Sequence, residues 1–179
     1  MSAKYSYGLK GVYIGTAAPT TGVVPAIANL TKLGEVYQET CNFNQDDPEI
    51  VEHREEGVAA PKVVQQSKTL PYITLTLMNP SAEVMERVFG GTASGDNWGI
   101  NGDEADVVKS VRLETKVGLD FGFPNALLTA KMNTTTISDK TIVLVDVTIR
   151  PQAVDAGKAF QTLAKAAASS SSSGSQQGA

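Results

Sequence analysis

Residues 111–123 indicate the fold class more clearly than any other stretch: Val-Arg-Leu-Glu-Thr-Lys-Val-Gly-Leu-Asp-Phe-Gly-Phe. Apolar side chains occupy alternate positions, and only Thr115 interrupts them, while charged residues and glycines fill the positions between. This period of two residues predicts a β-strand with one buried and one solvated face. At about 3.3 Å per residue the strand would reach roughly 40 Å, about twice the usual length. We therefore expect one strand that spans the molecule and forms part of a wall.

The remaining patterns predict a mainly β chain. A turn at Pro124-Asn125 should follow the long strand, and a second turn at residues 138–140 should join the last two strands. Alternation or short apolar runs between glycines and prolines predict strands over 8–15, 33–39, 71–78, 127–136 and 141–149. Long antiparallel strands of this kind close into a two-sheet sandwich or a barrel.

One helix is expected, over residues 80–89. Asn79 is a suitable N-cap, Pro80 suits the first helical position, and Gly90 follows the end. Ala82, Met85 and Phe89 have the spacing of one helical stripe, which would pack on the sheet. Residues 1–152 therefore form one β domain with a flanking helix. Residues 153–179 form a C-terminal extension, predicted as a weak helix over 153–168 and then a Ser- and Gly-rich tail.

A charged segment, within an arm at about residues 42–69, interrupts the domain. It cannot bury much surface by itself, so it is either a mobile arm or a contact for another chain, and we favour the contact. Residues 62–64 would pair back on it as an extended hairpin. The residues expected to contact another copy are Asp46, Asp47, Glu49, Ile50, Val51, Glu52, Arg54, Glu55 and Glu56.

Composition argues against several classes of function. The net charge of −4 does not suit a nucleic-acid-gripping surface, which needs clustered Lys and Arg. No apolar run is long enough for a membrane span, and the N-terminal residues lack the apolar core of a secretory signal. The single cysteine, Cys41, excludes an internal disulfide and fits a reducing compartment.

No residue pattern predicts catalysis, a cofactor or a metal centre. The only imidazole, His53, lies in the acidic segment, where a solvated or interface role is expected. Cys41 has no basic neighbour that would activate a thiol. The Asp- and Asn-rich loop at 96–106 fails the EF-hand pattern because Val108 falls where the bidentate Glu is required. An irregular calcium site in that loop and an acidic pair for glycoside hydrolysis stay open as alternatives.

Trp98 suggests a second, different function. Beside several Asp and Asn residues it could stack on a sugar, as in a lectin-like or adhesin β-sandwich binding module. The alternative is that Trp98 holds a Gly-rich loop against the core.

The solvated face of the long strand predicts the lining of a pore. Arg112, Glu114 and Lys116 would lie about 7 Å apart in one row, with Asp120 further along. Their charges alternate in sign and can screen one another, which leaves a hydrophilic strip of low net charge. The simpler interpretation is an ordinary solvated sheet face.

The order of segments resembles the major tail tube proteins of bacteriophages, over roughly residues 8–151. A glycine-rich first strand precedes the acidic arm, which a threonine-rich strand, a short helix and long strands follow. The residues that carry the resemblance are Leu33-Gly34-Glu35-Val36, Glu49-Ile50-Val51-Glu52, Glu55-Glu56-Gly57, Ile73-Thr74-Leu75-Thr76-Leu77, the segment 81–90 and Thr148-Ile149-Arg150-Pro151.

The resemblance implies a viral structural subunit without enzymatic activity. Copies would join as a homohexameric ring, and rings would stack into a hollow tube through which the genome is ejected without specific DNA binding. The arm would reach a neighbouring subunit or ring. Partners would be other tail proteins, namely the tape measure, a terminator and in contractile tails a sheath. The protein would be made in the host cytoplasm and reside in the virion tail; related tubes occur in bacterial injection systems.

Overall fold

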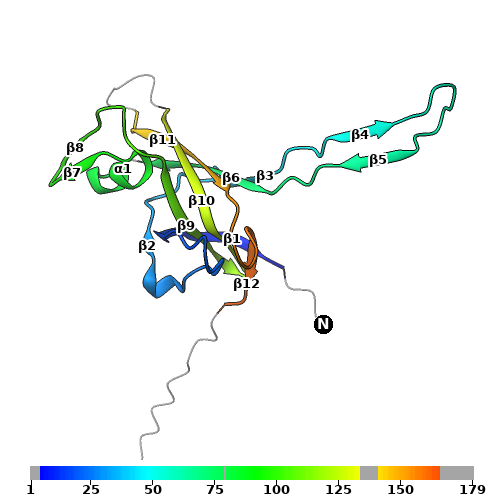
Figure 1. Cartoon of the computed structure of the whole chain (residues 1–179). Coiled ribbons are helices and arrows are strands. Elements are labelled where there is room, and N and C mark those ends of the chain that lie inside the picture. The colour runs from blue at the N-terminus through cyan, green and yellow to red at the C-terminus, as the bar shows by residue number, and fades with distance from the viewer. Residues whose placement is uncertain (1–4, 79, 134–140, 166–179) are drawn as a thin grey trace, which may run out of the picture.

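The computed structural model describes residues 5–78, 80–133 and 141–165, and shows a mainly β protein with a long projecting hairpin (Figure 1). Within these residues, eight strands form one antiparallel sheet in the order β2-β1-β9-β10-β11-β6-β3, with β12 also pairing with β10. Two further hairpins, β4-β5 and β7-β8, stand apart from it. The elements are β1 (Tyr7–Thr16), η1 (Ile27–Asn29), β2 (Thr31–Lys32), β3 (Asn42–Asn44), β4 (Ile50–His53), β5 (Val63–Gln66), β6 (Tyr72–Met78), α1 (Ala82–Phe89), β7 (Thr92–Ser94), β8 (Asn97–Gly99), β9 (Val107–Val117), β10 (Asp120–Met132), β11 (Leu144–Pro151) and β12 (Gln161–Leu163).

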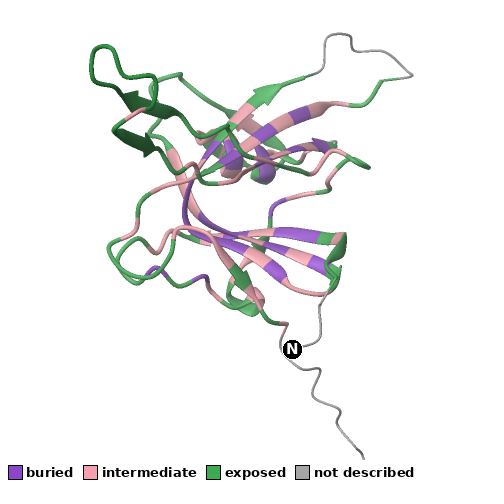
Figure 2. Cartoon of the chain, turned by 90° about the vertical axis from the view of Figure 1, so that its right-hand side faces the viewer, coloured by how far each residue is buried: buried purple, intermediate pink, exposed green. Residues whose placement is uncertain are grey.

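The large sheet bends over on itself, so its two halves form two layers (Figure 2). The segment after β2 runs from one layer to the other and holds them together. Leu33 N donates to Val12 O of β1 (2.8 Å), whereas Tyr37 N donates to Thr76 O of β6 (2.7 Å). These bonds satisfy backbone groups on both strands, and they give the domain its barrel-like closure.

The core lies between the two layers and beneath α1. Three residues of α1, Val84, Met85 and Val88, are buried there, and Ser81 caps the helix by accepting from Val84 N. The helix therefore begins two residues later than predicted, with Ser81 as its cap, while Gly90 ends it as expected. The fully buried side chains from the sheet and the closing segment are Val12, Leu33, Ile73, Leu77, Leu113, Val111, Phe123, Val145, Val147 and Ile149.

The predicted single strand over 111–123 is wrong: the stretch is a tight hairpin between β9 and β10. The chain reverses at Gly118, which has a φ of +93°, a conformation that glycine adopts at little energetic cost. Phe121 then pairs with Leu113, and Phe123 with Val111. Odd-numbered residues therefore share one face on both strands, so the period of two continues through the turn and conceals it.

Other boundaries also differ from the prediction. Pro124 and Asn125 form no turn but lie within β10, where the register with β9 shifts between residues 123 and 126. Residues 33–39 are not a strand, apart from an isolated bridge at Val36, because their backbone bonds are divided between two strands. No helix forms over 153–165; β12 pairs there with β10 instead. The strands over 8–15, 71–78 and 141–149 are confirmed within one to three residues. The turn at 138–140 and residues 134–136 and 166–168 fall outside the described residues.

Among the described residues, no helix has the length and apolar character needed to cross a membrane.

Candidate functional site

The arm is a two-stranded hairpin that leaves the body between β3 and β6 (Figure 1). β4 and β5 pair antiparallel, from Ile50 opposite Gln66 to His53 opposite Val63. This confirms the prediction that residues 62–64 pair back on the charged segment. All nine predicted contact residues, 46, 47, 49–52 and 54–56, are exposed in the single chain.

Side chains at the base of the arm join its two sides to each other and contact the sheet. Thr69 Oγ1 donates to Asp46 O (2.6 Å), and Gln45 Nε2 donates to Thr69 O (3.0 Å). Arg150 of β11 lies 3.6 Å from the Asp46 carboxylate and packs its guanidinium 4.1 Å from the centre of the Tyr72 ring. The hydrogen bonds thus join the two sides of the arm, and the exposed Asp46–Arg150 ion pair is a contact between its base and the sheet.

Both faces of the arm carry exposed apolar side chains. Paired positions share a face, so Ile50 and Val64 lie on one face with Glu52, and Val51 and Val63 lie on the other. Ile50 is 59% exposed and Val64 is 55% exposed. A two-stranded hairpin with no third strand or core is marginal in water. Such a hairpin gains stability when another surface covers its apolar side chains, so the arm is suited to binding.

The predicted pore-lining row is largely covered in the chain itself. Asp120 is 1% exposed and accepts from Arg112 Nη2 (2.8 Å), Thr115 N (3.0 Å) and Thr115 Oγ1 (3.4 Å). The Arg112 side chain is 11% exposed. The expectation that these side chains stand in open water is therefore wrong for Asp120 and for most of Arg112. Asp120 is an internal ion-pair partner that joins β9 to the start of β10.

Glu114 is also engaged within the subunit. It accepts from Lys10 Nζ (2.7 Å) and from the Tyr13 hydroxyl (3.1 Å), and its side chain is 12% exposed. The hydrogen bond and the negative charge of Glu114 raise the pKa of Lys10. Burial is the main cause that raises the pKa of Tyr13, and the hydrogen bond to Glu114 raises it further. Of the four candidates only Lys116 is exposed.

A different sheet face is polar and more open, and we call it the polar wall: Thr74, Thr76, Thr129, Lys131, Asp146 and Thr148. Thr148 of β11 lies between Thr74 of β6 and Thr129 of β10, and Asp146 lies between Thr76 and Lys131. Thr76 Oγ1 donates to Asp146 Oδ1 (2.7 Å). The alternation in 71–78 and 143–149 marked the outward side chains, but only the strand order places them side by side.

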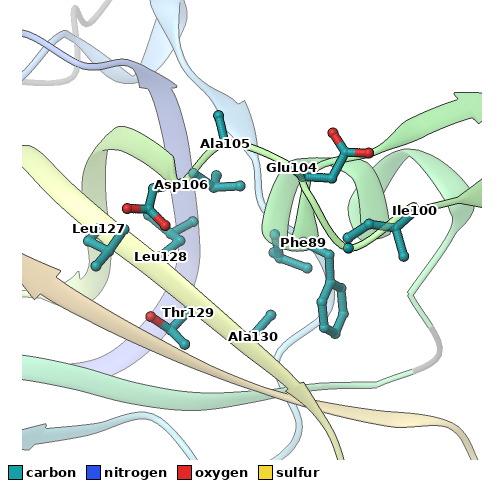
Figure 3. A pocket seen from close by; sticks show the side chains of 12 residues that line it. Phe89, Ile100, Glu104, Ala105, Asp106, Leu127, Leu128, Thr129 and Ala130 are labelled. Atoms are coloured by element: carbon teal, nitrogen blue, oxygen red, sulfur yellow. The ribbon is translucent and has the colours of Figure 1, made fainter.

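A shallow hollow of about 210 Å³ lies between the end of α1, the loop after β8 and β10 (Figure 3). Its lining mixes apolar side chains, Phe89 and Ala130 among them, with polar groups. Figure 3 shows the Glu104 carboxylate at the rim, directed away from these side chains. The predicted Asp- and Asn-rich loop thus gathers no converging set of oxygen ligands here. Among the described residues, no group of three or more His, Cys, Asp and Glu side chains could hold a metal ion.

Trp98 anchors its loop to the core. Its indole ring packs 5.4 Å from the Phe89 ring, and its Nε1 donates to Gly90 O (2.9 Å). Since Trp98 is partly buried and its donor is satisfied within the chain, the interpretation that it anchors the loop is confirmed.

The two candidates for nucleophilic chemistry, His53 and Cys41, have different surroundings. His53 is exposed near the tip of the arm, and Cys41 is partly buried beside β3. Burial raises the pKa of the Cys41 thiol to about 11, which keeps it protonated near neutral pH. An unreactive thiol is consistent with the sequence-based interpretation of Cys41.

The chain matches no known family model and no curated protein.

Proposed function

We propose that this protein is the structural subunit of a bacteriophage-type tail tube. Copies associate as rings, the rings stack, and the resulting channel conducts the genome into the host. In this role the protein is part of the virion tail, with the tape measure, terminator and, in contractile tails, sheath proteins as partners. The resemblance in segment order supports this function, and so does the bent two-layer β domain with its flanking helix.

The observation that carries the proposal is the projecting arm. Its two strands present four aliphatic side chains to solvent on two faces, far from its own core, and Asp46 at its base pairs with Arg150 of the sheet. An arm of this kind is stable when a neighbouring copy covers it, and repeated arm-to-body contacts between identical subunits generate rings or filaments.

The polar wall is a better lining for the channel than the row first predicted. Threonine hydroxyls are uncharged, and Asp146 and Lys131 on adjacent strands offset each other. Duplex DNA carries one charge per about 1.7 Å, so a basic channel would hold it, whereas a neutral or acidic wall lets it slide. In the row first predicted to line the pore, only Lys116 has an exposed charge, and that charge is positive.

Electron microscopy of the concentrated protein tests the proposal. We expect hollow tubes of constant width from the native chain. The double substitution Ile50→Asp with Val64→Asp should abolish tubes and leave a folded monomer, because it places charge where the arm would be buried. A control is Val23→Asp, which adds one such negative charge at an exposed aliphatic position outside the arm. Compact monomers at every concentration of the native chain would refute the proposal.

A further inference from the structure

The barrel-like core is open at one end, and an apolar groove of about 350 Å³ leads into it. One side of the groove comes from the start of β1, through Tyr7 and Leu9, and the other from Cys41 and Phe43 before the arm. Phe121 forms the floor, with its ring centre 4.9 Å from that of Phe43. Phe43 is exposed although its ring packs on the core, so the aromatic cluster continues from the interior to the surface.

An aromatic patch continues the groove outward. Tyr7 of β1 pairs with Val117 of β9, and these side chains are 63% and 44% exposed. Tyr5 lies beside them and is exposed as well. A contiguous aromatic and aliphatic surface of this kind on a small domain marks an interaction site. Moreover, among the described residues no strand pairs with the outer edge of β1 over residues 7–11, so backbone groups are also available there.

The rim of the groove is positively charged. Lys116 lies next to Gly8, which lines the groove; a Cβ on Gly8 would be 2.9 Å from the Lys116 side chain. Lys165 donates from Nζ to the carbonyl oxygens of Thr115 and Lys116, so its ammonium group is fixed at the same end of β9. None of the groove-lining residues is acidic. The surface therefore suits an occupant that is apolar in the centre and acidic at its border.

The arm has this combination of properties. Residues 45–69 carry six acidic and three basic side chains. The face with Ile50 and Val64 includes Glu52, whose exposed carboxylate also accepts from Arg54 Nε (3.1 Å), whereas the opposite face has His53 in the corresponding position and no carboxylate among its paired residues. In Figure 1 the arm extends away from the body, so it does not cover the groove of its own chain.

We propose that the groove between β1 and residues 41–43 is the docking site for the arm of a second copy. Ile50 and Val64 of the incoming arm fill the apolar groove and cover Tyr7, and Glu52 lies near Lys116 at the rim. This inference rests on the proposed self-assembly and assigns the receiving surface for it. The same contact repeated from copy to copy is heterologous, because a surface on one copy binds a different surface on the next, as ring and tube growth require.

Disulfide cross-linking between two variants tests the contact. Both carry Cys41→Ser; one also carries Tyr7→Cys, and the other, labelled with ¹⁵N, carries Val64→Cys. The two are mixed, assembled and oxidised with copper phenanthroline. Because a disulfide requires Cα atoms about 4.4–6.8 Å apart, the docked arm should give a peptide joining position 7 of one copy to position 64 of another, identified by its mixed isotope pattern. Val63→Cys, on the opposite face of the arm, is the matched control and should cross-link at least about tenfold less.

Charge reversal provides a second and independent readout. Glu52→Lys in the arm variant should lower the cross-link yield several-fold, and Lys116→Glu in the groove variant should restore it, because opposite charges again face each other. The yield should also fall as salt is raised, since the pair lies at an exposed rim. No rescue by the reversed pair would contradict the placement of Glu52 beside Lys116.

The outcomes separate the docking site from the proposed function. Tubes in the electron microscope without a 7–64 cross-link would overturn the docking site and leave the tube function standing. A 7–64 cross-link in particles that never form tubes would support the docking site and count against the tube. Cross-linking of position 7 to Ser172→Cys instead would identify the chain's own C-terminal segment as the occupant and overturn the proposal.

Discussion

Substituting Asp120→Asn should destabilise the protein strongly although it changes few atoms. The Asp120 carboxylate is 1% exposed and 2.8 Å from Arg112 Nη2. Asparagine can keep its oxygen on Thr115 N, but its NH2 group then faces Arg112 Nη2, so the change removes both the negative charge and the acceptor opposite a largely buried guanidinium. Removing one partner of a buried ion pair costs about 3–5 kcal/mol. We expect about 3 kcal/mol, the lower end, because the Arg112 side chain keeps 11% of its exposure to water.

Urea unfolding monitored by Trp98 fluorescence measures this cost. The protein is kept monomeric by including Ile50→Asp and Val64→Asp in all samples, so that assembly does not contribute. Glu83→Ala is the control: it breaks the exposed Glu83–Arg87 pair on α1, and we expect a loss of only about 0.3–0.5 kcal/mol. A second variant, Asp120→Asn with Arg112→Met, should regain much of the lost stability because no buried charge remains. If Asp120→Asn lowers the free energy of unfolding by less than about 1 kcal/mol, the buried ion pair is refuted and Asp120 belongs to a solvated face.

Three further predictions follow from the structure. Gly118→Ala should lower the free energy of unfolding by about 2–4 kcal/mol, because φ is +93° and the new Cβ would lie 2.3 Å from a backbone oxygen. Gly57→Ala, at φ +81° with no described atom within 4 Å, should lower it by only about 1 kcal/mol. Equal losses in urea unfolding would contradict the tight β9–β10 turn. Burial raises the pKa of Cys41 from 9.0 to about 11, so its thiol should react with a thiol reagent about a hundredfold more slowly at pH 8 than in the urea-unfolded chain. Its contribution to stability should be lost as pH rises from 9 towards 11. A reaction rate equal to that of the unfolded chain would disprove its burial. In assembled tubes the cysteine of Thr148→Cys should react with a small maleimide but not with a maleimide attached to a bulky polymer, whereas in the monomer it should react with both. Reaction of intact tubes with the bulky reagent would show that the polar wall faces outward.

The sequence identified the elements whose signals are local. Alternation over 8–15, 71–78 and 141–149 marked three strands because each has one face in the core. The cap signals at Asn79, Pro80 and Gly90 and the helical spacing of apolar residues defined α1 within two residues, although the structure has Ser81 and not Asn79 as the N-cap. The arm was also visible, since no apolar periodicity in 45–57 could support a core.

The turn within 111–123 illustrates where local signals fail. Phe121 pairs with Leu113 in a register that keeps odd-numbered residues on one face, so the pattern is the same for one long strand and for a hairpin. The φ of Gly118 decides between them, and although glycine favours a turn or a bulge, its presence alone does not show that the chain reverses there. The burial of Asp120 could not be predicted for the same reason: only the reversal brings it opposite Arg112.

Sequence alone determined that this protein is mainly β, has one short helix and carries an acidic arm unable to form its own core, because periodicity and capping act between near neighbours along the chain. Tertiary structure alone decided which polar face is open, the direction in which the hairpin arm projects, and that an apolar groove with a basic rim lies at the open end of the barrel. Those features depend on contacts between residues far apart in sequence, such as Lys10 with Glu114 or Phe43 with Phe121, and no pattern within either segment contains them.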